Sequence, residues 1–129
     1  SVYENIEFPL ILNKIDSVVR KEKVMQAIDW VGLTDKVNSR PNQLSGGQCQ
    51  RTAIARAIVH EPSLVLADEP TANLDSENSH HIMEIMQKLN KNLNTSFIFA
   101  THDEKIMGYL RRIVYLEDGS IVKDNPVEK

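Results

Sequence analysis

Residues 44–51 combine a serine, two consecutive glycines and the start of an apolar helical pattern. Ser45 can cap a helix, because its hydroxyl can accept a hydrogen bond from a backbone N–H in the first turn. Gly46 and Gly47 have no Cβ, so we predict a sharp turn there, followed by a helix over residues 51–60. Free N–H groups and the positive end of a helix dipole favour a phosphate. Taken alone, the segment is explained better as an ordinary capped turn.

Acidic residues and a histidine follow two predicted strands. Asp68 and Glu69 come directly after the apolar run 64–67, and His102 follows the run 96–100. Polar residues at the carboxyl ends of parallel strands lie where such sheets bind ligands. An aspartate there can hold Mg²⁺ against nucleotide phosphates, an adjacent carboxylate can activate water, and a histidine can contact a transferred phosphoryl group. Singly, these residues fit a turn signal and a loop histidine equally well; together they favour a catalytic site.

Strands and helices alternate from residue 44 onward, which predicts an α/β sheet. The runs 64–67 and 96–100 are continuous apolar segments, typical of parallel strands that are buried on both faces. Asp75 or Ser76 is placed to cap a helix between them. The apolar face of that helix consists of Ile82, Ile85, Met86 and Leu89. Residues 118–119, Asp-Gly, then predict a β-hairpin near the end of the chain.

The first 43 residues predict a small helical unit. Ser1 and Glu4 have the spacing of a capping box, and Pro9 can kink or shorten the helix that follows. A second helix, capped at residue 16 or 17, is predicted to end at Trp30. We therefore divide the chain into a helical unit, 1–43, and an α/β unit, 44–129.

Composition narrows the function classes. The 129 residues carry a formal charge of −3, which gives no basic surface for nucleic acid or anionic lipid. No apolar run approaches the length that spans a membrane. The single cysteine, Cys49, excludes an internal disulfide and fits a reducing compartment. A cytoplasmic protein is therefore expected.

The order of four motifs resembles that of ATP-binding cassette (ABC) ATPases. Residues 44–48 resemble the signature motif, 64–70 Walker B, 72–75 the D-loop and 101–103 the H-loop. The resemblance covers essentially the whole chain. Residues 2–6 and 9–10, together with 40–41 and 67–71, are most similar to the lipoprotein-release and macrolide-export branch. It implies a partial P-loop NTPase (RecA-like) parallel sheet, with an N-terminal helical subdomain and a C-terminal β-hairpin.

The resemblance also implies a role for each matching residue. Asp68 would serve Mg²⁺, Glu69 would be the catalytic base and His102 would contact the γ-phosphate of ATP. Asp75 would couple the two sites of a dimer. The residues that would contact ATP held mainly by the partner subunit are Ser45, Gly46, Gly47 and Gln48. The helical unit would dock on transmembrane permease subunits, which places the protein on the cytoplasmic face of the cell membrane.

The phosphate-binding Walker A loop of the family is absent from these residues. That loop requires G-x-x-x-x-G-K-[ST], and none of the five glycines is followed by lysine. We therefore expect the chain to be the C-terminal part of a cassette, without Walker A and Q-loop, and to hydrolyse no ATP alone. The family's Walker A strand would lie beside residues 96–100. Without it the sheet has unpaired edges, so we also expect dimerisation or strand exchange.

Two functions remain open from the sequence. The leading one is a truncated ATP-binding and ATP-hydrolysing subunit of an ABC transporter that powers export or lipoprotein release. The alternative is a catalytically inactive fragment that acts as a binding or dimerisation module and donates its signature loop to a full-length partner. An ABC ATPase of DNA repair is disfavoured, because the chain lacks a long coiled coil and a basic surface.

Overall fold

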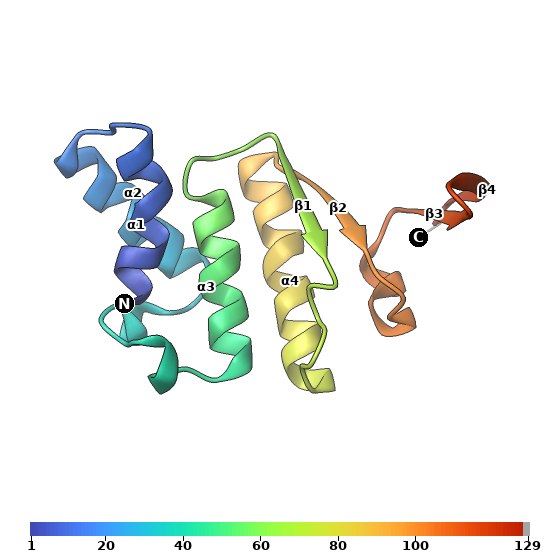
Figure 1. The fold of residues 1–129 in the computed structure, drawn as a ribbon, viewed down its shortest axis with the longest axis horizontal. Coiled ribbons are helices and arrows are strands. Elements are labelled where there is room, and N and C mark those ends of the chain that lie inside the picture. The colour runs from blue at the N-terminus through green and yellow to red at the C-terminus, as the bar shows by residue number, and fades with distance from the viewer. Residues whose placement is uncertain (128–129) are drawn as a thin grey trace.

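The computed structural model describes residues 1–127. The first three α-helices form one end of the molecule and the last two strands the other, with the fourth α-helix and the first two strands between them (Figure 1). The α-helices are α1 (Val2–Leu12), α2 (Ser17–Trp30), α3 (Gly46–Ile58) and α4 (Ser76–Leu93). The strands are β1 (Leu64–Asp68), β2 (Ser96–Ala100), β3 (Arg112–Glu117) and β4 (Ser120–Pro126). Short 3₁₀-helices are η1 (Thr34–Lys36), η2 (Pro41–Gln43) and η3 (Glu104–Tyr109).

The starts of α1 and α2 confirm the capping residues predicted from the sequence. The Ser1 hydroxyl accepts a hydrogen bond from the Glu4 N–H, and the Glu4 carboxylate accepts one from the N-terminal amine. Asp16 caps α2 by accepting a hydrogen bond from the Val18 N–H at 2.9 Å. Pro9 neither ends nor shortens α1, which continues to Leu12.

Helix α3 begins five residues earlier than the sequence predicted. The Ser45 hydroxyl accepts a hydrogen bond from the Gln48 N–H at 3.2 Å, and the Gln48 amide oxygen accepts one from the Ser45 N–H at 2.9 Å. This reciprocal capping box satisfies donors on both sides of the glycines and starts the helix at Gly46. The predicted sharp turn at Gly46 and Gly47 is therefore wrong: both belong to the first helical turn.

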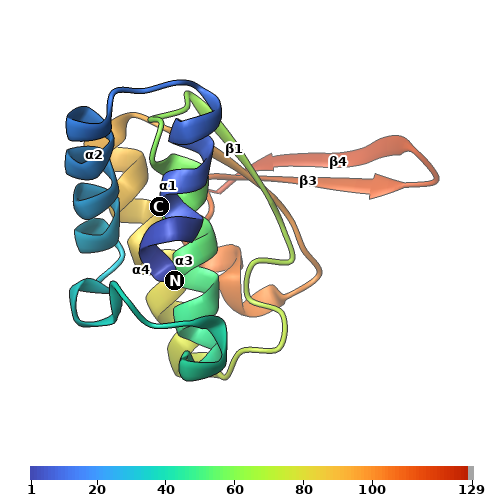
Figure 2. The same cartoon turned by 60° about the vertical axis from the view of Figure 1, so that its left-hand side comes forward.

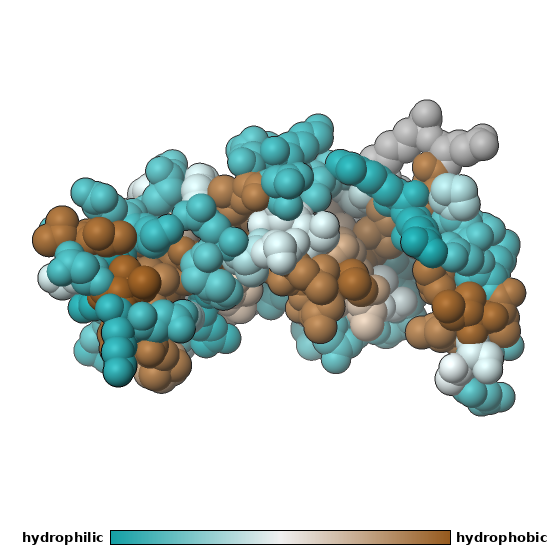
Figure 3. Space-filling model, turned by 90° about the horizontal axis from the view of Figure 1, so that it is seen from above, coloured by the Kyte–Doolittle hydropathy of each residue, from teal (hydrophilic) through white to brown (hydrophobic). Residues whose placement is uncertain are grey.

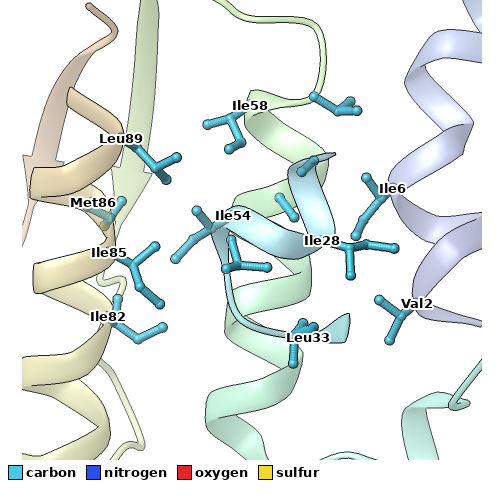
Figure 4. Packing of buried hydrophobic residues seen from close by; sticks show 14 of the residues in the cluster. Val2, Ile6, Ile28, Leu33, Ile54, Ile58, Ile82, Ile85, Met86 and Leu89 are labelled. Atoms are coloured by element: carbon cyan, nitrogen blue, oxygen red, sulfur yellow. The ribbon is translucent and has the colours of Figure 1, made fainter. Parts of the chain in front are cut away.

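The hydrophobic core is arranged around α3 (Figure 4). Ile54 and Ile58 lie between the buried face of α4 on one side and the side chains of α1 and α2 on the other. The predicted apolar face of α4 is confirmed, and its buried residues include Ile82, Ile85, Met86 and Leu89. Because α3 packs on both sides, the helical end of the molecule draws on residues from both predicted units. The division at residue 43 remains a prediction.

Strands β1 and β2 form a parallel pair in which Asp68 lies opposite Ala100. Burial alternates along both strands: Val65, Ala67, Phe97 and Phe99 pack against the core. The alternate residues face outward, and Leu66 is 73% exposed and Ile98 56% exposed. The expectation that these strands are buried on both faces is wrong for this chain. Within residues 1–127 the core covers one face of the pair and leaves the apolar residues of the other uncovered.

The predicted C-terminal hairpin is confirmed. Glu117 pairs with Ser120 across Asp118 and Gly119, and both of these turn residues have positive φ. This is the conformation that a two-residue hairpin turn favours. The β3–β4 hairpin extends away from the helices (Figure 2).

Hydrophobic residues reach the surface at both ends of the molecule (Figure 3). At the helical end they include Phe8, which is 57% exposed, and Leu12, which is 65% exposed. None of the helices described within residues 1–127 combines the length and the apolar character that a membrane crossing requires.

The central position of α3 predicts a large difference between two isoleucine substitutions. Ile58 is fully buried, so Ile58→Ala should lower the free energy of unfolding by about 2–5 kcal/mol. Ile11, also on a helix, is 46% exposed, and Ile11→Ala should change it by no more than about 0.5 kcal/mol. Urea unfolding measures both values. Equal losses would contradict the packing of α3.

Candidate functional site

The ends of β1 and β2 bring the predicted strand-end residues together. Asp68 is the last residue of β1, and Ala100, its partner in the ladder, is the last of β2. The Glu69 N–H donates to the Ala100 carbonyl at 2.8 Å, so the hydrogen bonding between the two segments continues one residue beyond the end of β1. Glu69 and His102 therefore leave the sheet at the same edge, as the sequence predicted for a parallel pair.

Both oxygens of the Glu69 carboxylate are engaged. His102 Nδ1 lies 2.5 Å from Glu69 Oε1, and the Thr101 hydroxyl donates to Glu69 Oε2 at 3.1 Å. Since a carboxylate only accepts hydrogen bonds, Nδ1 of His102 carries the proton in this contact. The backbone of Glu69 has a φ of 46°, a conformation that non-glycine residues rarely adopt and that often occurs at functional sites.

The environment of Glu69 stabilises its ionised form. The hydrogen bond from His102 is the main cause that lowers the pKa of the Glu69 carboxyl; partial burial opposes it, and the Thr101 hydroxyl lowers the pKa further. A carboxyl with a depressed pKa stabilises the fold above its ordinary pKa. This contribution is lost as the pH falls through the folded-state value.

A second set of hydrogen bonds links the segments that follow β1 and β2. The sequence predicted no individual role for the residues that form it. The Thr101 hydroxyl, which donates to Glu69, accepts a hydrogen bond from the Asp103 N–H at 3.0 Å. The Asp103 carboxylate accepts one from the buried Thr71 hydroxyl at 3.2 Å. These contacts hold the segment after β1 against the segment after β2. In the sequence, only the closeness of these three residues to the predicted motifs pointed to them. Which of them form hydrogen bonds with each other depends on the register of β1 and β2.

Asp75 lies at the start of α4, where the chain turns away from the strand end. Its carboxylate caps the helix by accepting a hydrogen bond from the Asn78 N–H at 2.8 Å and one from the Asn78 side-chain amide at 2.8 Å. The backbone N–H of Asn78 is the main cause that lowers the pKa of the Asp75 carboxyl, followed by the Asn78 side chain. Asp75 is therefore a helix cap in addition to its predicted coupling role.

The signature residues gather at the start of α3. The side chains of Ser45 and Gln48 each accept a hydrogen bond from the other residue's backbone N–H. The N–H groups of Gly46 and Gly47 belong to the first turn of the helix, so they have no hydrogen-bond partner within it. This turn lies against the start of α4, since a Cβ on Gly46 would contact the Leu74 side chain at 3.5 Å. Among residues 1–127, no hydrogen bond joins the signature residues to Glu69 or His102. The predicted site residues thus form two clusters.

The metal expectation rests on Asp68 alone. Residues 1–127 contain no group of three or more His, Cys, Asp or Glu side chains that could hold a metal ion. The Asp68 carboxylate is exposed at the strand end, which fits Mg²⁺, an ion that takes one or two carboxylates together with phosphate oxygens and water. Two shallow surface hollows, of about 300 and 260 Å³, lie among the helices and away from this site.

The sequence profile of the ABC transporter family matches residues 1–72. The chain belongs to this family. It is 44% identical over 121 residues to the lipoprotein-releasing system ATP-binding protein LolD of Pseudoalteromonas translucida, a match that covers 94% of this chain and 52% of LolD. It is 45% identical over 125 residues to the cell division ATP-binding protein FtsE of Streptococcus pneumoniae, covering 96% of this chain and 54% of FtsE.

The solved structures include the ATP-binding cassette MJ0796, described as a dimer in a post-hydrolysis state bound to ADP and Pi. It matches this chain with a TM-score of 0.83 and 35% identity, over 100% of this chain and 57% of the cassette. The ABC ATPase family, its LolD-like branch and the partial P-loop NTPase fold are therefore confirmed. The ABC chain spans about half the length of the curated relatives that it matches.

The hydrogen bonds to Glu69 predict how its pKa responds to substitution. His102→Ala should raise the pKa of Glu69, because it removes the largest stabilising contact of the carboxylate, and Thr101→Val should raise it by less. The matched control is His80→Ala, since His80 contacts Tyr109 instead. NMR titration of the Glu69 side-chain carboxyl measures each value. No change in the His102→Ala variant would contradict the described contact.

Proposed function

We propose that this chain forms part of the ATP-binding subunit of an ABC transporter and supplies the signature half of an ATP site that a partner subunit completes. The observation that supports this most directly is the separation of the site residues into two clusters. One lies at the ends of β1 and β2 and the other at the start of α3. A site built from one cluster of each of two subunits brings both kinds of group to one nucleotide.

The strand-end cluster is proposed to serve hydrolysis. Asp68 would hold Mg²⁺, which when bound neutralises negative charge on the phosphates. Glu69 would act as the catalytic base: its carboxylate is ionised and is oriented by His102 and Thr101, so it can accept a proton from a water within hydrogen-bond reach. His102, whose side chain is 90% exposed, would contact the γ-phosphate.

The helix-start cluster is proposed to contact ATP that is held by the partner. Gly46 is exposed at the first turn of α3, where N–H groups and the helix dipole favour an anion. The Ser45 hydroxyl and the Gln48 side chain lie at the same helix start. Asp75, at the adjacent start of α4, would couple this site to its counterpart across the dimer.

The partners follow from the same proposal. The MJ0796 cassette is described as a dimer, which supports a second ABC ATPase subunit as one partner. The helical unit, 1–43, would contact transmembrane permease subunits, and the exposed Phe8 and Leu12 offer apolar surface for such a contact. This arrangement would place the ABC chain on the cytoplasmic face of the membrane, where ATP hydrolysis would drive export or lipoprotein release.

A catalytically inactive binding module is the second candidate. The exposed apolar face of the β1–β2 pair, with Leu66 and Ile98, favours it, because such a face and its open strand edges invite another chain. In that case the chain would dimerise, or would lend its signature residues to a complete cassette without catalysis of its own.

A mixing experiment tests the donated signature. This chain alone should hydrolyse no ATP, and neither should a Walker A-bearing LolD-type cassette whose own signature serine is replaced. Together they should hydrolyse ATP at the site that joins the cassette's Walker A to Ser45–Gln48 of this chain, because each partner supplies what the other lacks. Phosphate release measures the rate.

Two variants of this chain test whether the rescue depends on the signature residues. Ser45→Arg should return the mixture to background, since it disrupts the cap and the first turn of α3. Glu69→Gln should leave the rate unchanged, because Glu69 would serve the other ATP site of the pair, whereas the base of the rescued site belongs to the cassette. A mixture that stays inactive, or a rescue that survives Ser45→Arg, would count against the proposal.

A further inference from the structure

We infer that Asn78 is a positioning residue that fixes the first turn of α3 against Asp75, so that the signature residues and the start of α4 move as one unit. This inference rests on the proposed function and deepens it, because it names the side chain through which two parts of the proposed ATP site are joined within one subunit.

The first observation is the space beside Gly47, which is buried. A Cβ built on Gly47 would lie 2.5 Å from Asn78 Oδ1, a separation that Cβ atoms essentially never show, and 3.0 Å from Asn78 Cγ. Gly47 is in the regular helical turn, so a close neighbour, and not an unusual backbone conformation, favours glycine here; any larger side chain must displace the Asn78 amide. Gly46 differs, since its added Cβ would make only an ordinary contact with Leu74 at 3.5 Å.

The second observation is how Asn78 is held. Its backbone N–H donates to Asp75 Oδ1 and its side-chain NH₂ donates to Asp75 Oδ2, both at 2.8 Å. A carboxylate can only accept, so the NH₂ group must face Asp75 and the amide oxygen must face Gly47. The half-buried Asn78 side chain is thus fixed by Asp75 at one end and lies against α3 at the other.

These two contacts form a continuous connection from Gly47 through Asn78 to Asp75. A displacement of the first turn of α3, such as one caused by ATP on a partner, would press on the Asn78 amide. That amide is a hydrogen-bond donor to Asp75, so the position of the Asp75 carboxylate would respond. Asn78 would act without touching nucleotide.

The pKa of Asp75 reports this connection in the chain itself. Gly47→Ala should raise the pKa of Asp75, because the added methyl displaces the Asn78 amide, whereas Gly46→Ala should leave the pKa unchanged. Asn78→Ala should also raise it, through the lost side-chain donor. In the Asn78→Ala background, Gly47→Ala should have no further effect. NMR titration of the Asp75 carboxyl in all five proteins, wild type included, completes this cycle.

Two outcomes of these titrations would contradict the role of Asn78. The inference would be overturned if Gly47→Ala left the pKa of Asp75 unchanged. It would also be overturned if Gly47→Ala shifted this pKa equally in the wild-type and Asn78→Ala backgrounds. If Gly47→Ala does not fold, Asn78→Ala still decides, because it only removes atoms: an unchanged pKa of Asp75 in that variant would overturn the inference.

The mixing assay separates this inference from the proposed function. No rescue by the wild-type chain would refute the donated signature, while the pKa cycle would still decide the role of Asn78. If rescue occurs, Asn78→Ala should lower kcat with little change in the KM for ATP, since the partner holds the nucleotide. An unchanged kcat would overturn the positioning role.

Discussion

The packing of α3 on two sides is the constraint on which the rest of the structure depends. Ile54 and Ile58 lie between α4 and the pair α1–α2, so one helix joins α1 and α2 to α4 (Figure 4). Interiors packed this closely transmit displacement instead of absorbing it. By our inference, a displacement of the first turn of α3 would reach α4 through this core and, at the helix starts, through Asn78 and Gly47.

The predicted site residues of the ABC chain lie in two clusters, which we propose to be two half-sites. The strand register brings Asp68, Glu69 and His102 to one edge of the sheet, whereas the Ser45 cap leaves the N–H groups of the first turn of α3 at a different place. In the proposed dimer each cluster meets a nucleotide together with groups from the partner, and the segment between β1 and α4 connects the two clusters within one chain.

Local signals in the sequence predicted most of the fold. The caps at Ser1, Asp16 and Asp75 and the apolar face of α4 each depend on residues a few positions apart. One error was local, because the capping box of Ser45 and Gln48 starts α3 five residues earlier than predicted. The others arose where distant groups decide. The sequence does not show that Leu66 would be uncovered, because burial depends on what packs there. Nor does it show that Thr71 bonds to Asp103 or that Asn78 fills the space beside Gly47.

Hydrogen exchange at Gly46 and Gly47 tests the donated signature most directly, because these N–H groups have no partners within α3. Their exchange should slow when the chain is mixed with Mg²⁺, ATP and a Walker A-bearing cassette, and should not slow when either the cassette or ATP is omitted. Unchanged exchange at both glycines in the complete mixture, in a sample that hydrolyses ATP, would contradict the account.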